Sequence, residues 1–334
     1  MQNMGPNERP LLEIHDVVQE FKVPGRGRRR TLQAVSRVSF EVNKGESLGI
    51  VGETGSGKTT LARAVLQIPR PTSGSVLLLG IDLTRISGRR LREQRRAMQM
   101  VFQNPYGSVN PKWKVADIVE EPLIGFGLGD SSARRRRVEM VLAQVGLPLR
   151  VFGARRPREL SGGQCQRVAI ARALVSRPKL IICDEAVASL DALTRMQILD
   201  LFRWLRREFQ LSYLFISHDL EIVKLVSDRV AVMYLGQLCE IAFTKSLFGQ
   251  PQHPYTIELI ASIDSAGSER RRLNEPISEL TPAATDLSGC RFRSRCPRAQ
   301  ERCVLERPIL RKVREGHFVA CHYPTLSDNT RVPI

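Results

Sequence analysis

Residues 52–59 of this chain, Gly-Glu-Thr-Gly-Ser-Gly-Lys-Thr, follow the G-x-x-x-x-G-K-[ST] pattern of a phosphate-binding loop. Glycines let the backbone curl until successive N–H groups face inward, so a triphosphate is held with few side-chain cations. We expect Lys58 to reach the β- and γ-phosphates, and the hydroxyl of Thr59 to bind Mg²⁺. The expected nucleotide contacts are Gly52, Glu53, Thr54, Gly55, Ser56, Gly57, Lys58, Thr59 and Thr60.

A second segment of small residues lies at positions 161–164 and can also bind an anion. It opens a helix predicted over residues 164–174. Backbone N–H groups at the start of a helix attract negative charge. The candidate phosphate contacts of this segment are Ser161, Gly162, Gly163 and Gln164.

Two adjacent acids follow an apolar run at residues 179–184 that predicts a buried strand. Asp184 would lie at the carboxyl end of the strand, where open α/β sheets bind ligands, and we expect it to hold Mg²⁺. Glu185 can polarise an attacking water as a general base. An acidic helix N-cap would explain Asp184 alone, but not the pair.

The elements that must position these groups are short apolar strands followed by helices. Residues 46–51 predict a buried strand that ends at Gly52, and residues 60–66 have helical spacing. The phosphate loop therefore lies between a strand and a helix, which is the context its pattern requires. A third strand, predicted at residues 212–216, is followed by His218, which can hydrogen-bond the γ-phosphate.

The order of these motifs resembles the ATP-binding cassette (ABC) superfamily from about residue 12 to about residue 250. The resemblance implies that Gln103 links metal, water and transport domain, and that Phe21 stacks on adenine. It also implies that His218 is the switch histidine and that residues 188–191, which include Asp191, form the D-loop. In that superfamily the signature segment, here residues 160–164, meets the γ-phosphate held by the opposite subunit. ATP therefore closes a dimer, and hydrolysis releases it.

Residues 102–111 and the C-terminal region resemble one branch of this superfamily, the dipeptide/oligopeptide/nickel importers. The C-terminal resemblance covers the His-Pro-Tyr-Thr segment at residues 253–256 and a frame of four cysteines, Cys290, Cys296, Cys303 and Cys321. A module of about 45 residues is too small to build its own core, which suggests a metal staple. Some members of the branch carry a [4Fe–4S] cluster there. Zn²⁺ and plain reduced cysteines are the alternatives, and the absence of a short C-x₂₋₄-C pair counts against zinc.

The fold predicted from motifs and resemblance is α/β, a P-loop NTPase cassette with a mixed-sheet core. We place the cassette at residues 11–250, with a helical subdomain inserted at about 104–158. A cysteine-rich extension is expected at residues 251–334, with a linker at residues 264–286.

Composition and charge bear on the location and the partners expected of the chain. The chain has 334 residues and a net charge of +17, with arginine runs that we place in loops around the helical region. A solvated face is the favoured interpretation of these runs, ahead of proximity to an anionic membrane and of nucleic-acid binding. No apolar stretch approaches the roughly 18–20 residues of a membrane span. The N-terminus lacks a signal-peptide core, and the seven cysteines are expected to be thiols or ligands.

The resemblance implies an ATPase subunit that uses ATP and Mg²⁺ to energise the import of di- or oligopeptides. Implied partners are two transmembrane permease subunits, a second ABC ATPase that is either another copy or, as is frequent in the branch, a paralogue, and an extracytoplasmic substrate-binding protein, with no nucleic acid. The implied location is peripheral, on the cytoplasmic face of the bacterial plasma membrane. Import of nickel or another small solute is the alternative, because no residue here selects the cargo. A non-transport ATPase acting on nucleic acid is disfavoured, because the chain holds one cassette and no coiled coil between its phosphate motifs.

Overall fold

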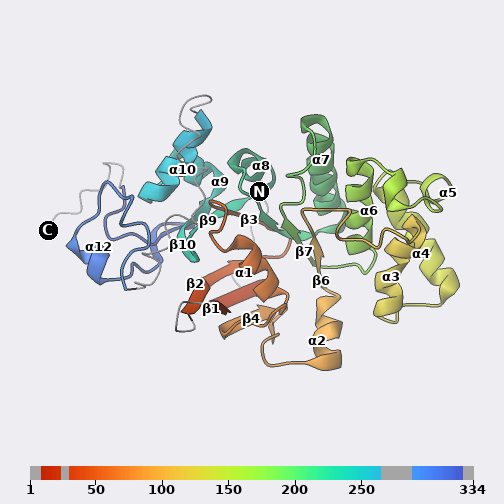
Figure 1. Cartoon of the computed structure of the whole chain (residues 1–334), viewed down its shortest axis with the longest axis horizontal. Helices are drawn as coiled ribbons and strands as arrows, with labels where there is room; N and C mark the ends of the chain where they lie inside the picture. Colours follow the sequence, from red (N-terminus) through yellow and green to blue (C-terminus); the bar gives the residue numbers. More distant parts are fainter. Residues whose placement is uncertain (1–8, 24–29, 265–287, 326–334) are drawn as a thin grey trace. The chain divides into compact units, whose positions relative to one another are not determined.

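The computed structural model of the chain describes residues 9–23, 30–264 and 288–325. The chain divides into two compact units, and many of their helices and strands are labelled in Figure 1. Unit 1 takes the described residues up to Glu13 together with Glu41–Ser47 and Ser75–Phe215, and unit 2 takes Ile14–Phe40, Leu48–Gly74 and the described residues from Ile216 on. The predicted linker lies outside the described residues, except for Asp264, which ends a helix.

Unit 2 contains a run of neighbouring strands that leads to the phosphate loop. Their order is β11 (Arg311–Arg314), β12 (His317–Val319), β10 (Gln237–Phe243), β9 (Arg229–Tyr234) and β3 (Ser47–Val51). β3 and β9 are parallel, whereas β10 pairs antiparallel with both β9 and β12. β3 is buried along its whole length, which is why its sequence is a continuous run with few polar residues.

The other elements of unit 2 surround these strands. They are β1 (Leu12–Val23), β2 (Arg30–Val42), α1 (Lys58–Val65), α8 (Leu220–Val226), α9 (Thr244–Gly249), α10 (Pro254–Asp264) and α12 (Glu301–Leu305). One hydrophobic cluster joins β9, β10, α8 and α10 to Phe292 of the C-terminal extension. The ring of Phe292 lies 5.3 Å from that of Tyr234 and 5.4 Å from that of Tyr255. The extension therefore shares a core with the cassette strands of unit 2 and does not need to build one of its own.

Unit 1 carries the strand that ends in the acid pair. β6 (Met98–Val101) and β7 (Leu180–Asp184) are parallel neighbours in register from Met98 with Leu180. β8 (Ser212–Ile216) follows α7 (Ala192–Phe209), and β4 (Ser73–Leu78) pairs antiparallel with β5 (Ile81–Asp82). β7 and β8 are buried along their whole length, as predicted for residues 179–184 and 212–216.

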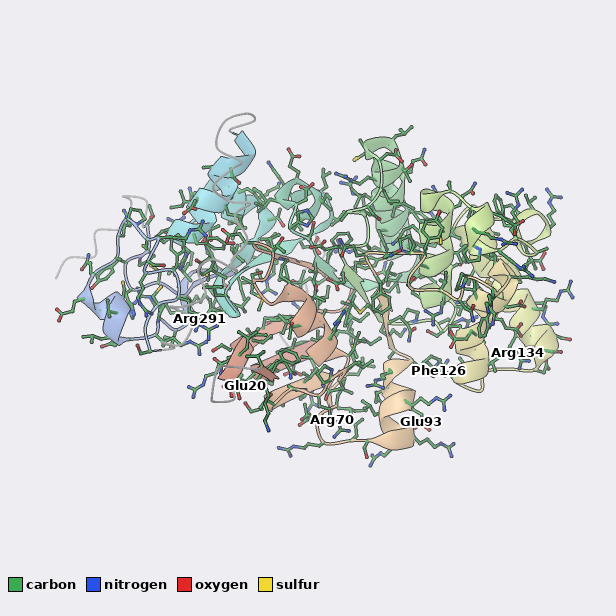
Figure 2. All side chains as sticks on the ribbon, viewed as in Figure 1. Glu20, Arg70, Glu93, Phe126, Arg134 and Arg291 are labelled. Carbon is green, nitrogen blue, oxygen red and sulfur yellow. The ribbon has the colours of Figure 1, made fainter. Side chains whose placement is uncertain are left out.

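The helical part of unit 1 comprises α3 (Val115–Gly125), α4 (Ser131–Gln144), α5 (Leu149–Phe152), the 3₁₀ turn η1 (Pro157–Glu159) and α6 (Gly162–Leu174). Two ion pairs join its helices. Arg172 of α6 contacts Glu121 of α3 at 2.8 Å, and Arg134 of α4, labelled in Figure 2, contacts Glu120 at 2.7 Å. Both acids lie on α3, so the ion pairs tie that helix to its two neighbours.

The placement of the arginine runs in loops was wrong for Arg89, Arg90 and Arg95, which lie inside α2 (Gly88–Arg95), and for residues 134–137, which lie inside α4. Arg155 and Arg156 do lie in a loop, between α5 and η1. The physical reason is that arginine is a good helix former. The carboxylate of Asp130 also caps α4 by accepting the N–H of Ala133 at 2.8 Å. Within the residues placed by the structure, no helix has the length and apolar character needed to span a bilayer.

Candidate functional site

The phosphate loop of unit 2 is held in a curl that only glycine can adopt at two positions. Gly52 has φ 153° and Gly57 has φ 101°. A Cβ on Gly52 would lie 2.0 Å from the carbonyl oxygen of Met233, and one on Gly57 would lie 2.3 Å from that of Ala34. Neighbouring backbone therefore packs directly against the outside of the loop, and both glycines of the pattern are needed for the close approach.

The ammonium of Lys58 hydrogen-bonds to three groups of the loop that precedes it. It donates to the carbonyl of Gly52 at 2.7 Å, to that of Glu53 at 2.9 Å and to Oγ of Ser56 at 3.3 Å. Gly57 gives α1 no side-chain cap, and the first turn of the helix contains no acid. The loop therefore offers a buried ammonium at the start of a helix that no side chain caps, and this combination suits a phosphate.

The remaining predicted site residues of unit 2 lie on β1 and after β8. Phe21 is 38% exposed on β1, so its ring is open to a ligand, although no contact tests its predicted stacking on adenine. His218 is exposed, and it directly follows Ser217, whose N–H donates to the carbonyl of Ile50 at 3.1 Å. That bond places the start of the His218 segment beside β3, the strand that ends at the phosphate loop.

The acid pair of unit 1 lies at the end of β7, as predicted. Asp184 is the last residue of the strand and is buried. Glu185, which is half-buried, has φ 51°, in the left-handed region that non-glycine residues rarely occupy. Its carbonyl accepts the N–H of Ala188 at 3.0 Å, which closes a turn. Strained backbone of this kind is found at functional sites, where the surrounding structure maintains it.

Gln103 and the D-loop meet in unit 1. Gln103 is exposed after β6, and its carbonyl accepts the hydroxyl of Ser189 at 3.3 Å. Asp191 caps α7 by accepting the N–H of Thr194 at 2.9 Å. The hydrogen bonds from Thr194 lower the pKa of Asp191, so this carboxylate is ionised at neutral pH. The D-loop aspartate therefore has a structural partner within its own subunit.

The signature segment forms a helix start with a complete capping box. Oγ of Ser161 accepts the N–H of Gln164 at 3.3 Å, and Oε1 of Gln164 accepts the N–H of Ser161 at 3.0 Å. A Cβ on Gly163 would lie 2.4 Å from Cγ2 of Thr194, so glycine is required there for helix packing. The side chain of Gln164 is thus engaged in capping, and α6 begins at Gly162, two residues earlier than predicted.

A metal site was expected at the four cysteines of the extension. None of them forms a disulfide, and the N–H of Cys290 donates to the carbonyl of Cys303 at 2.8 Å. Burial raises the pKa of Cys290, of Cys296 and of Cys321, in the last case to about 11. Across residues 9–23, 30–264 and 288–325, no group of three or more His, Cys, Asp or Glu side chains is arranged to hold a metal ion. The shared core around Phe292 means that the extension does not need a metal ion to supply a core of its own.

Two contacts to the phosphate loop were not predicted from the sequence. The hydroxyl of Tyr255 accepts the N–H of Glu53 at 3.0 Å, and the guanidinium of Arg295 pairs with the carboxylate of Glu53 at 2.9 Å. Both come from the C-terminal extension, about 200 residues or more away along the chain. The sequence could have predicted such a contact from Glu53 alone, because a carboxylate inside an anion-binding loop requires a cationic partner.

Comparisons with known proteins agree with the motif order. Residues 35–188 match the family described as ABC transporter, and residues 239–303 match the family described as oligopeptide/dipeptide transporter, C-terminal region. The oligopeptide transport ATP-binding protein AppF of Bacillus subtilis is 42% identical over 95% of this chain and 98% of AppF. OppF of Haemophilus influenzae, with the same description, is 40% identical over 94% of this chain and 97% of OppF.

A solved structure adds evidence from the fold. A dimeric ATP-binding cassette in a post-hydrolysis state, bound to ADP and Pi, superimposes with a TM-score of 0.62. It is 28% identical to this chain and covers 70% of it and 98% of the cassette. The share of this chain outside that match is consistent with an extension beyond a cassette.

Proposed function

Because the chain belongs to the ATP-binding subunits of ABC transporters, in their oligopeptide/dipeptide branch, we propose that it hydrolyses ATP to drive the import of di- or oligopeptides. The observation that carries the peptide assignment is the oligopeptide/dipeptide C-terminal match at residues 239–303, in the same chain as a folded phosphate loop. Both relatives described above are named for oligopeptide transport. Nickel import and nucleic-acid processing have no comparable support.

The proposed reaction is in-line attack of water on the γ-phosphorus of ATP. Glu185 takes the proton from the water as the new P–O bond forms. The bond to the β–γ bridging oxygen breaks, and ADP and phosphate leave. Lys58 moves from the loop carbonyls to the β- and γ-phosphate oxygens, and His218 and Gln103 respond to the γ-phosphate. Mg²⁺, when bound, neutralises phosphate charge, and Thr59, Gln103 and Asp184 supply the oxygen ligands that it prefers.

The signature segment implies a partner of the same kind. A capping box forms the start of α6, and the backbone N–H groups of Gly162 and Gly163 in its first turn suit an anion. We assign the anion as the γ-phosphate bound by a second cassette, either a copy or a paralogue. Two permease subunits and an extracytoplasmic substrate-binding protein complete the proposed importer, with this chain peripheral on the cytoplasmic face of the membrane.

The proposal is tested by whole-cell uptake of labelled dipeptides, longer peptides and Ni²⁺. We expect peptide uptake to be lost in Glu185→Gln and retained in Glu208→Gln, which removes an exposed acid of α7 as a matched control. Loss of Ni²⁺ uptake with intact peptide uptake would contradict the peptide assignment. Unchanged uptake of the whole panel in Glu185→Gln would contradict the proposed function.

A separate measurement tests whether the four cysteines bind an iron–sulfur cluster, zinc or no metal. Iron, zinc and acid-labile sulfide are assayed in the chain purified without oxygen. Stoichiometric iron and sulfide would establish a cluster, zinc alone would establish a zinc site, and neither would leave four reduced thiols packed beside the core.

A further inference from the structure

Glu53, the second residue of the phosphate loop, has each of its polar groups held by a partner. Its N–H donates to the hydroxyl of Tyr255 at 3.0 Å. Its two carboxylate oxygens accept from one guanidinium nitrogen of Arg295, at 2.9 and 3.0 Å. Its carbonyl accepts from the ammonium of Lys58 at 2.9 Å. The same residue is therefore tied both to the C-terminal extension and to the lysine that must bind phosphate.

Arg295 is itself fixed in position. Its other terminal nitrogen pairs with the carboxylate of Glu258 on α10, so the guanidinium bridges two acids. The guanidinium also lies 5.8 Å from the ring centroid of Tyr234 and 5.6 Å from that of Phe292. The side chain of Glu53 is 8% exposed and that of Arg295 is 22% exposed. An ion pair this shielded from water is screened less than a surface pair, and removing one partner strands the other.

The charge of Arg295 is secure despite its partial burial. Burial alone would lower the pKa of the guanidinium, but the hydrogen bond with Glu258 and the charge of Glu53 outweigh it and raise that pKa. Tyr255 is equally well held, because its side chain is fully buried and its ring lies 4.6 Å from that of Tyr234. Burial raises the pKa of Tyr255, so its hydroxyl is neutral and stays in place as an acceptor.

We propose that Arg295 and Tyr255 are positioning residues for ATP binding, which hold Glu53 so that the phosphate loop and Lys58 are ready for the triphosphate. This inference rests on the proposed function as an ATPase. The extension thereby becomes part of the nucleotide site, with both residues acting through Glu53. Arg295 has a second effect, since it neutralises a carboxylate that would otherwise repel the phosphates from within the loop.

Equilibrium binding of MgATP to the purified full-length chain tests the proposal, with steady-state hydrolysis measured alongside. We expect Arg295→Ala to weaken MgATP binding about 10-fold, and Tyr255→Phe to weaken it about 3-fold, on the scale of a lost charged and a lost neutral hydrogen bond. The KM for ATP should rise by similar factors with kcat little changed. Arg295→Lys, which keeps a cation, should fall between Arg295→Ala and the native chain.

A double variant separates positioning from simple loss of structure. Glu53→Gln combined with Arg295→Ala removes the stranded carboxylate, so it should bind MgATP more tightly than Arg295→Ala alone. A purely structural role predicts no such recovery. Arg298→Ala is the matched control, because Arg298 is exposed in the same module and its side chain donates to the hydroxyl of Thr325, away from Glu53. Thermal unfolding of each variant checks folding, and Tyr255→Phe carries the test where Arg295→Ala does not fold.

Each outcome has a distinct meaning. Unchanged MgATP affinity in both Arg295→Ala and Tyr255→Phe, with native binding intact, would overturn this inference and leave the proposed function standing. No recovery in the double variant would also overturn it. No MgATP binding by the native chain would overturn the proposed function together with the inference.

Discussion

At the scale of single residues, the geometry of the phosphate loop explains why its sequence pattern requires glycine. Gly57 combines φ 101° with a backbone carbonyl 2.3 Å from the position of a Cβ, so any side chain is both strained and in collision. The loop cannot relax toward Ala34 without moving β2, nor away from it without displacing Lys58. The sequence pattern predicted the loop and its lysine correctly, because both are local features.

We therefore expect Gly57→Ala to reduce MgATP affinity by at least about 10-fold, because left-handed strain of roughly 1–2 kcal/mol adds to the clash. Gly125→Ala is the control, since a Cβ there meets nothing within 4 Å. The two variants are compared by equilibrium binding. Equal affinities would mean that the loop adapts, and that its close packing against Ala34 is not needed for binding.

The partner of Glu53 could not be predicted from local sequence patterns. Arg295 is 242 residues away along the chain. It lies among cysteines that the sequence analysis interpreted as a candidate metal site. The charge of Glu53 indicated that a cation was needed but not which one, because the chain contains 51 lysines and arginines. The packing of Phe292 against Tyr234 and the ion pair with Glu258 hold the arginine beside Glu53, and neither contact is local in sequence.

At the scale of elements, a buried network attaches the extension to β10. The carboxylate of Glu240, which is fully buried, accepts the N–H groups of Gln252 and His253 at 2.8 Å each, and meets Nε2 of His317 on β12 at 2.6 Å. Nδ1 of His253 accepts the N–H of Tyr255 at 3.0 Å. The His-Pro-Tyr segment is therefore a structural joint that presents Tyr255 to the phosphate loop, a role its resemblance to a family did not reveal.

This joint should make stability depend on pH. Burial lowers the pKa of His253 to about 4, against the opposing influence of Glu240. Between that value and the ordinary histidine value near 6.5, the unfolded chain binds more protons than the folded one, so stability falls as pH falls. From pH 7 to pH 5 we expect a loss on the order of 2 kcal/mol from this residue.

The measurement is denaturant unfolding at pH 7 and pH 5 for the native chain and for His253→Asn, whose side-chain oxygen can still accept the N–H of Tyr255. The variant should lose less stability on acidification than the native chain. An identical pH dependence in both proteins would show that His253 does not titrate in this range.

At the scale of the whole molecule, motif order predicted the cassette, and the strand ends carry the predicted residues in each unit. Asp184 ends β7 and Gly52 follows β3 because apolar strands and phosphate motifs are recognisable from short windows of sequence. The helical part was predicted less well, since the arginine-rich start of α4 has little apolar periodicity and only Asp130 marks its cap. The packing of the extension depends on contacts between distant segments, so its shared hydrophobic core could not be predicted from the sequence.

The proposed function depends on ATP hydrolysis with Glu185 as the general base. Its most direct test is the rate of ATP turnover by the purified chain and by the Glu185→Gln variant. We predict that the variant binds MgATP with native affinity but turns it over at least about 100-fold more slowly, within the range that general-base catalysis contributes. Turnover by Glu185→Gln at the native rate would contradict the account.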